Sequence, residues 1–235
     1  MQRRHRRESD ALSRLTAEIV SCVACPRLVA WRQHVATEKR AAFRDEEYWA
    51  RPLPGFGDPL ASLLVVGLAP AAHGGNRTGR LFTGDRSGDW LFGALWRAGY
   101  ANQPASVARD DGLRLTGCYI AAAVRCAPPA NKPTIEERDR CLPYLAREVA
   151  LLERLRVIVV LGKFAYDSVC RLLGVRRRPP FGHLAEVALT DQRDLVILCS
   201  FHPSQQNTFT GKLTEEMLDA VFARARRLSV SRLSG

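Results

Sequence analysis

Four short runs of apolar, largely β-branched residues stand out along the chain and predict the strands of a sheet. They are Leu63–Val66, Tyr119–Ala123, Val157–Leu161 and Leu195–Leu198. Continuous apolar runs of this length are typical of strands that are buried on both faces. The segments between the runs are long enough to form helices, so the pattern predicts a parallel sheet whose strands are connected by helices.

Apolar residues at helical spacing lie before, between and after these runs. They predict five helices, over Asp10–Val20, Gly88–Ala98, Thr134–Leu155, Lys163–Leu173 and Leu213–Leu228. Thr134 and Glu137 have the spacing of a capping box, and Pro143 predicts a kink or a later start in the same helix. The elements together predict an α/β protein, a three-layer α/β/α sandwich around a short central four-stranded parallel sheet.

The length of 235 residues is within the range of a single hydrophobic core. We expect residues 1–9 to form a basic tail that need not be ordered, and residues 10–235 to form one domain. Between the first helix and the first strand, Trp31–Pro59 contains two prolines and two glycines close together (Pro52, Pro54, Gly55 and Gly57). This composition predicts an irregular surface segment.

The charge of the chain points to a polyanionic partner. The formal net charge is +11, and basic residues concentrate at Arg3–Arg7, Arg176–Arg178 and Arg224–Arg227. A solvated charged surface is the alternative interpretation. No apolar run approaches the roughly 20 residues that span a bilayer, and the start MQRRHRRESD lacks the apolar stretch of a secretory signal. We therefore expect a cytoplasmic protein without a membrane partner.

Unusual loops follow three of the four predicted strands, at the edge where open parallel sheets bind their ligands. They are GLAPAAHGGNRTGRLFTGD from Gly67, RCAPPANKP from Arg125 and SFHPSQQN from Ser200. The first has the glycines of a phosphate-binding loop but neither the Gly-Lys-Ser/Thr ending nor G-x-G-x-x-G, so a nucleotide phosphate is not favoured. We expect the three loops to converge on one cleft.

The seven cysteines fall into two groups. Three lie in or beside apolar elements and are expected to be small buried hydrophobes (Cys118, Cys170 and Cys199). The other four lie beside prolines or in polar segments: Cys22 and Cys25 form C-x-x-C-P, and Cys126 and Cys141 follow the second strand. Four thiolates suit either a tetrahedral zinc or an iron–sulfur cluster, and the spacing does not choose between them.

Four blocks, SCVACPRLVAW, GLAPAAHGGNRTGRLFTGD, AVRCAPPANKPT and SFHPSQQNT, together resemble the bacterial and archaeal family 5, or type B, uracil-DNA glycosylases. The resemblance runs from about Cys22 to Leu228. It implies the uracil-DNA glycosylase fold and a monofunctional hydrolase of base excision repair that leaves an abasic site. It also implies a [4Fe-4S] cluster held by Cys22, Cys25, Cys126 and Cys141. One departure is Leu81, where the family commonly has proline.

A glycosylase must extrude its target nucleotide, hold the flipped base and stabilise a sugar cation and a departing anionic base. Phe82 is the candidate for stacking on the base, with core packing as the alternative. Asn131 is the candidate for reading the Watson–Crick edge, and a turn-forming Asn is the alternative. The glycine loop would form the wall of the pocket, including Ala69.

Two residues are the catalytic candidates. His202 is positioned to donate a hydrogen bond to the departing base, although loop histidines often serve only as caps. Positions 69–72 are Ala-Pro-Ala-Ala and offer no side chain for water, so Asp85 is assigned the role of orienting water or stabilising the sugar cation. Capping of a helix is the alternative role for Asp85, and His73 and Asn76 are alternative groups for positioning water.

DNA contacts are expected from the same loops. Gln206 is the candidate for filling the space left by the flipped base, and basic side chains are candidates for phosphate contacts (Arg77, Arg80, Lys132 and Lys212). A pocket with few obligatory hydrogen bonds predicts a broad range that includes uracil, hypoxanthine and xanthine. We expect a monomer. A non-catalytic iron–sulfur protein that binds damaged DNA is the competing hypothesis.

Overall fold

The computed structural model describes residues 2–189 and 194–230, with side chains from Asp10 onward. Its centre is a six-stranded sheet in the order β1-β3-β2-β4-β6-β5. Four neighbouring strands run parallel: β3 (Cys118–Ala122), β2 (Leu63–Gly67), β4 (Val157–Leu161) and β6 (Leu195–Ser200). The predicted parallel sheet is therefore confirmed, and its four strands begin and end within two residues of the apolar runs.

Two antiparallel edge strands extend this sheet beyond the four that we predicted. β1 (Phe56–Gly57) pairs with β3, and β5 (Glu186–Leu189) pairs with β6. Both are short and only partly buried, because an edge strand is not enclosed on both faces. Because these two strands are antiparallel to their neighbours, the sheet as a whole is mixed.

The five predicted helices are all present. They are α1 (Gln2–Val20), α4 (Arg86–Arg97), α5 (Ile135–Leu151), α6 (Lys163–Leu172) and α8 (Glu215–Val230). The backbone of α1 is helical from Gln2, in continuity with the helix predicted from Asp10, while the side chains of the basic segment lie outside the described residues. The capping box of Thr134 and Glu137 is confirmed, so α5 does not start late; it runs through Pro143.

The prediction of an irregular segment from Trp31 is wrong for its first part. Residues 26–38 form helix α2 (Pro26–Glu38), in which Pro26 occupies the first turn, where proline's missing N–H costs nothing. Shorter helical pieces complete the chain: the 3₁₀ helices η1 (Ala41–Phe43) and η2 (Pro129–Asn131), and the short helices α3 (Gly75–Thr78) and α7 (Gln205–Phe209).

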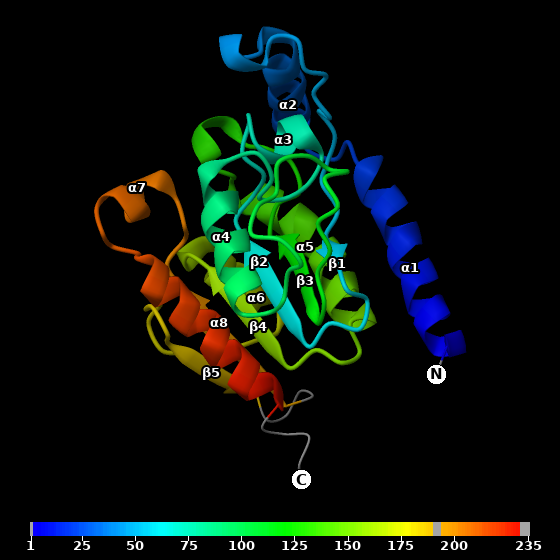
Figure 1. Ribbon diagram of the computed structural model, residues 1–235. Coiled ribbons are helices and arrows are strands. Elements are labelled where there is room, and N and C mark those ends of the chain that lie inside the picture. The colour runs from blue at the N-terminus through cyan, green and yellow to red at the C-terminus, as the bar shows by residue number, and fades with distance from the viewer. Residues whose placement is uncertain (1, 190–193, 231–235) are drawn as a thin grey trace.

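Alternate residues of the central strands pack against the two helical layers. Leu63 and Val65 of β2 lie in one hydrophobic cluster with α4 and α8, and Leu64 and Val66 lie in another with α1, α5 and α6. Figure 1 shows α4 and α8 side by side in front of the strands and α7 projecting from one side. Within the described residues, no helix has the length and apolar character to cross a bilayer.

Candidate active site and cysteine cluster

The loop that follows β2 places Phe82 over the end of that strand. A Cβ added at Gly67, the last residue of β2, would lie 2.6 Å from the Phe82 ring. A Cβ at Gly88 would lie 1.8 Å from the carbonyl oxygen of Phe82. Phe82 itself has φ of 55°, a left-handed conformation that is unfavourable for a bulky residue. The missing side chains of these two glycines therefore leave room for the half-buried ring and the strained backbone of Phe82. The sequence analysis had assigned no role to Gly88.

Asp85 is the N-cap of α4. Its Oδ1 accepts a hydrogen bond from the backbone N–H of Gly88 at 3.0 Å, and its Oδ2 faces Gly74, where an added Cβ would lie 2.2 Å away. Burial raises the pKa of Asp85, and the N–H groups of Gly88 and Ser87 partly oppose the shift. The carboxylate is thus fixed at a helix N-terminus and partly withdrawn from solvent, so capping does not preclude a catalytic role.

His202 follows β6 and lies beside Phe82. The two ring centroids are 6.1 Å apart and the rings are tilted by 30°. The backbone carbonyl of His202 accepts a hydrogen bond from Asn207 Nδ2 at 2.8 Å, which links it to α7. Although part of the residue reaches the surface, burial lowers the pKa of its imidazole to about 4. A neutral imidazole donates a hydrogen bond without carrying a charge.

Asn131 lies in η2, after β3, with an exposed side chain. Its φ is 55° and that of Ala130 is 52°. Asn tolerates the left-handed region better than Ala does, so the loop stores strain at Ala130. The exposed amide is available to a ligand.

Three other residues predicted for the pocket are engaged within the protein. His73 Nδ1 lies 3.0 Å from the Tyr48 hydroxyl oxygen, and Asn76 Nδ2 donates to the carbonyl of Arg32 at 3.2 Å. Asn76 is fully buried, whereas Ala69 is half-buried and packs against the cysteine-containing cluster described below. Their contacts attach the β2 loop to the rest of the protein.

Two of the four predicted phosphate contacts also have internal partners. Arg80 is 8% exposed and donates to the hydroxyls of Thr83 and Ser106, the carbonyl of Arg109 and the carboxylate of Asp111. Four of the five N–H donors of the Arg80 guanidinium are thus used inside the protein, which leaves little of it for a phosphate. Arg77 pairs with Glu46 and donates to the carbonyls of His73 and Gly84.

The remaining predicted DNA contacts are exposed. Lys132 lies just after η2, while Gln206 lies in α7 and Lys212 follows it. Phe209, also in α7, is 67% exposed, and the guanidinium carbon of Arg86 lies 4.3 Å from its ring centroid. The sequence analysis missed Phe209. It could have been found as the aromatic residue that ends the polar segment after His202.

The four cysteines of the second group come together between α2, α5 and the end of β3. Cys25, Cys126 and Cys141 lie in one buried cluster with Leu28 and Val124. Cys22 is close enough to influence the pKa of the other three thiols. Within the described residues, no three His, Cys, Asp or Glu side chains are close enough to hold a single metal ion. The other three cysteines are buried, as predicted.

Hydrogen-bond donors surround this cysteine cluster. Arg32 Nη1 donates to Cys126 Sγ at 2.9 Å, and the backbone N–H of Arg125 donates to Cys141. Arg140 is a hydrogen-bond partner of Cys25, and Tyr144 of Cys22. Donors directed at sulfur stabilise the anionic thiolates that bind metal.

Comparison with known proteins gives a consistent family. Residues 54–226 match the uracil DNA glycosylase superfamily. A type-5 uracil-DNA glycosylase of Mycobacterium tuberculosis is 51% identical over 224 residues, covering 94% of this chain and 83% of the relative. One of Thermus thermophilus is 52% identical over 212 residues, covering 90% and 95% of the two chains.

A more distant likeness covers part of the chain. A type-4 uracil-DNA glycosylase of Pyrobaculum aerophilum is 34% identical over 131 residues, which is 55% of this chain and 59% of the relative. The type-5 matches extend over most of both chains. By its sequence and by a fold that places Phe82, Asp85 and His202 at one edge of a mostly parallel sheet, the chain belongs to the type-5 uracil-DNA glycosylases of the uracil-DNA glycosylase superfamily.

Proposed function

We propose that this enzyme hydrolyses the N-glycosidic bond of uracil in DNA, and also that of the deaminated purines hypoxanthine and xanthine. Its family places it among the uracil-DNA glycosylases of base excision repair, which are hydrolases of N-glycosyl bonds. The observation that carries the assignment of residues is the position of Phe82 beside His202, with Asp85 three residues farther along the same loop.

The flipped base stacks on Phe82 in this proposal. An aromatic face contributes about 1–3 kcal/mol to holding a base and accepts pyrimidines and purines alike. The close approach of Phe82 to Gly67 and Gly88 supports this role, because a side chain at either glycine would displace Phe82. The exposed amide of Asn131 reads the edge of the base.

His202 acts on the departing base. As the N-glycosidic bond breaks, negative charge develops on the base, and the neutral imidazole donates a hydrogen bond to one of its carbonyl oxygens. The lowered pKa of His202 supports this form of the ring, since it remains neutral throughout the physiological range.

Asp85 acts on the sugar. Its carboxylate stabilises the cationic sugar and accepts a proton from the water whose oxygen bonds to C1′. The products are the free base, which leaves with the electron pair of the broken bond, and an abasic site in the DNA. The N-terminus of α4 favours the ionised carboxylate, which opposes the effect of burial.

The broad substrate range follows from how few polar side chains are available to the base. His73 Nδ1 and Asn76 Nδ2 are already bonded to Tyr48 and to the carbonyl of Arg32, so two polar atoms of the loop after β2 are withdrawn from the base. Strong rejection of an analogue requires buried polar groups that only the correct base satisfies. A pocket based on Phe82 and Asn131 imposes few such requirements.

DNA is held by the exposed side chains near the pocket. Lys132 and Lys212 contact phosphates, and Gln206 with Phe209 of α7 fills the space that the flipped nucleotide leaves. The enzyme acts on cytoplasmic DNA as a monomer. These assignments rest on exposure and on proximity along the chain, which places Gln206, Phe209 and Lys212 near His202 and Lys132 next to Asn131.

Cys22, Cys25, Cys126 and Cys141 hold a [4Fe-4S] cluster in this proposal. The donor set is all sulfur, and the donors that face it suit thiolates. Each cysteine of such a cluster binds a different iron, so the four need not close on a single metal ion. The cluster would connect the start of the chain with α5 and the end of β3, as a structural element.

The test is excision of the base from a labelled duplex containing one uracil, hypoxanthine or xanthine, followed by alkaline cleavage at the abasic site. The wild type should cleave all three duplexes, and Asp85→Asn and His202→Gln should lose most of the activity. Cleavage of the uracil duplex alone would contradict the broad range. Tight binding of all three without cleavage would instead favour the non-catalytic binding protein.

A further inference from the structure

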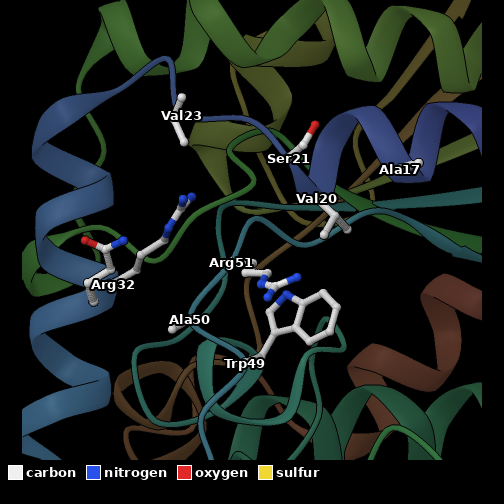
Figure 2. Close-up of a pocket in the computed structure, with 9 residues that line it drawn as sticks. Ala17, Val20, Ser21, Val23, Arg32, Trp49, Ala50 and Arg51 are labelled. Atoms are coloured by element: carbon white, nitrogen blue, oxygen red, sulfur yellow. The ribbon is translucent and has the colours of Figure 1, made fainter.

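A cavity of about 470 Å³ opens beside the cysteine cluster. It lies between the end of α1, helix α2 and the segment that contains Trp49 and Arg51 (Figure 2). Its volume is in the range of sites that hold small molecules. None of the residues assigned to catalysis lines it, so its presence is not explained by the glycosylase reaction.

Arg32 forms the wall between this cavity and the cysteines. The residue lines the cavity and is only 4% exposed. Its Nη1 donates to Cys126 Sγ at 2.9 Å, and both terminal nitrogens reach the carbonyl of Cys22, at 3.5 and 3.4 Å. Its Nε is buried and has no hydrogen-bond partner within the described residues. The guanidinium is therefore oriented toward Cys126, and in this orientation its Nε–H makes no hydrogen bond to the described residues.

The other three donors to the cysteines differ in position. Arg125, Arg140 and Tyr144 are not part of the cavity lining. Of these donors, only Arg32 both donates to a cysteine, Cys126, and lines the cavity. Removing Arg32 would take away a positive charge and a hydrogen bond, and it would extend the cavity toward Cys126.

We propose that the cavity is an access route for small molecules to the metal cluster and that Arg32 closes its inner end. The inference rests on the [4Fe-4S] cluster proposed above. Arg32 is a positioning residue in this role: it contacts a ligand of the cluster and acts on the iron only through that ligand. Mutating a residue that hydrogen-bonds to a metal ligand commonly lowers the metal affinity by about 10- to 100-fold. Hydrogen bonds to the sulfur atoms and solvent access also set the reduction potential of a cluster.

The test follows iron release from the purified holoenzyme under anaerobic conditions with excess iron chelator, using the visible absorbance of the cluster. Arg32→Met should release iron about 10-fold faster or more and should have a lower reduction potential, because a positive charge near the cluster is lost. Arg32→Lys keeps the charge and should show a smaller change. Arg51→Met is the matched control, since Arg51 lines the same cavity and should release iron at the wild-type rate.

A second substitution distinguishes access from the loss of a hydrogen bond. Ala17 is exposed on α1 and lines the cavity, so Ala17→Trp should partly fill it. In the Arg32→Met background it should slow iron release again while leaving the potential unchanged. An Arg32→Met enzyme that retains iron as the wild type does would overturn the proposal, as would an unchanged rate on adding Ala17→Trp. Wild-type protein without iron and sulfide would instead overturn the cluster itself, while uracil excision still tests the glycosylase.

Discussion

The loop after β2, residues 68–85, differs from the loops after β3 and β6 in what its polar side chains contact. In the β2 loop, Asn76, Arg77 and Arg80 are bonded to other parts of the protein. In the other two loops, Asn131 and Lys132 after β3 and Gln206 after β6 are exposed. All three loops leave the same edge of the sheet, yet one is built as a framework and two present side chains to solvent.

This difference separates stability from recognition. A buried charged group whose partner is removed costs several kcal/mol, whereas an exposed one contributes little to folding. Substitutions in the β2 loop should therefore act on folding, and those in the other loops on DNA or base binding. Asp85 in the β2 loop and His202 in the loop after β6 are exceptions, because substitution of either should act on catalysis.

Asp85→Asn should give the largest effect. Asn caps a helix as well as Asp does, so the hydrogen bond from Gly88 and the stability should persist. The base and the negative charge are lost, and kcat should fall by about 10²- to 10⁴-fold. Single-turnover excision and thermal unfolding measure the two quantities, with Asp89→Asn in the same helical turn as control. A large drop in stability would assign Asp85 to the framework alone.

The pH profile sharpens the same assignment. The active form of Asp85 is ionised, so activity is lost as the pH falls through its pKa. Because burial raises that pKa, the acid limb of kcat/KM should lie above the ordinary carboxyl value of about 3.9. His202, with a pKa of about 4, should add no second limb above pH 5.

Arg80→Met should lower the free energy of unfolding by about 3 kcal/mol, because the buried carboxylate of Asp111 loses its ion-pair partner and keeps only backbone N–H donors. Burial by itself would raise the pKa of Asp111, but Arg80 and backbone N–H groups hold it at about 2. The stabilisation is present above the unfolded pKa and is lost as the pH falls toward 2, so the variant should show a weaker acid dependence.

Denaturant unfolding of Arg80→Met at several pH values measures both effects. The exposed Arg114→Met should change stability by no more than about 0.5 kcal/mol. Equal losses in the two variants would remove the distinction between framework and surface arginines.

His202→Gln should lower kcat by about 10²- to 10³-fold, because the donor to the departing base is displaced. Its effect should depend on the leaving group: a base that departs as a more stable anion needs less help. Comparison of uracil with 5-fluorouracil in single-turnover excision checks this. An equal loss on both bases would place the role of His202 in positioning instead.

Lys132→Gln should have the smallest effect. Stability and kcat should be unchanged, while the slope of log affinity against log salt should fall by about 0.9, the value for one phosphate contact. Fluorescence anisotropy with labelled duplex DNA measures the slope. Arg154→Gln is the control, since this exposed residue precedes β4 at the opposite edge of the sheet. The same slope in both variants would remove Lys132 from the DNA surface.

The central strands and main helices could be predicted because burial on both faces leaves an unmistakable apolar pattern. β5 could not be predicted, because it is short and buried and exposed residues alternate along it. Its exposed Glu186 forms an ion pair with Arg224. α2 was missed because its apolar residues do not gather on one face of the helix as those of the predicted helices do, although Pro26 marked its start.

The site was predictable where a residue's role depends on its neighbours in sequence. Asp85 as an N-cap followed from its position just before the apolar pattern of α4. The burial of Arg80 did not, because its partner Asp111 lies 31 residues away in a segment without a periodic pattern. The hydrogen bond from Arg32 to Cys126, across 94 residues, was hidden for the same reason.

The helix that begins at Asp85 depends on the last helix of the chain. Leu91, Phe92 and Leu95 of α4 share a hydrophobic cluster with α8, and Arg97 donates to the carboxylate of Asp219 at 2.8–3.1 Å. During synthesis, α4 leaves the ribosome well before the surface that covers it. Truncation before Glu215 should therefore cause aggregation of the newly made chain, because apolar surface of α4 and of the neighbouring strands would be left uncovered.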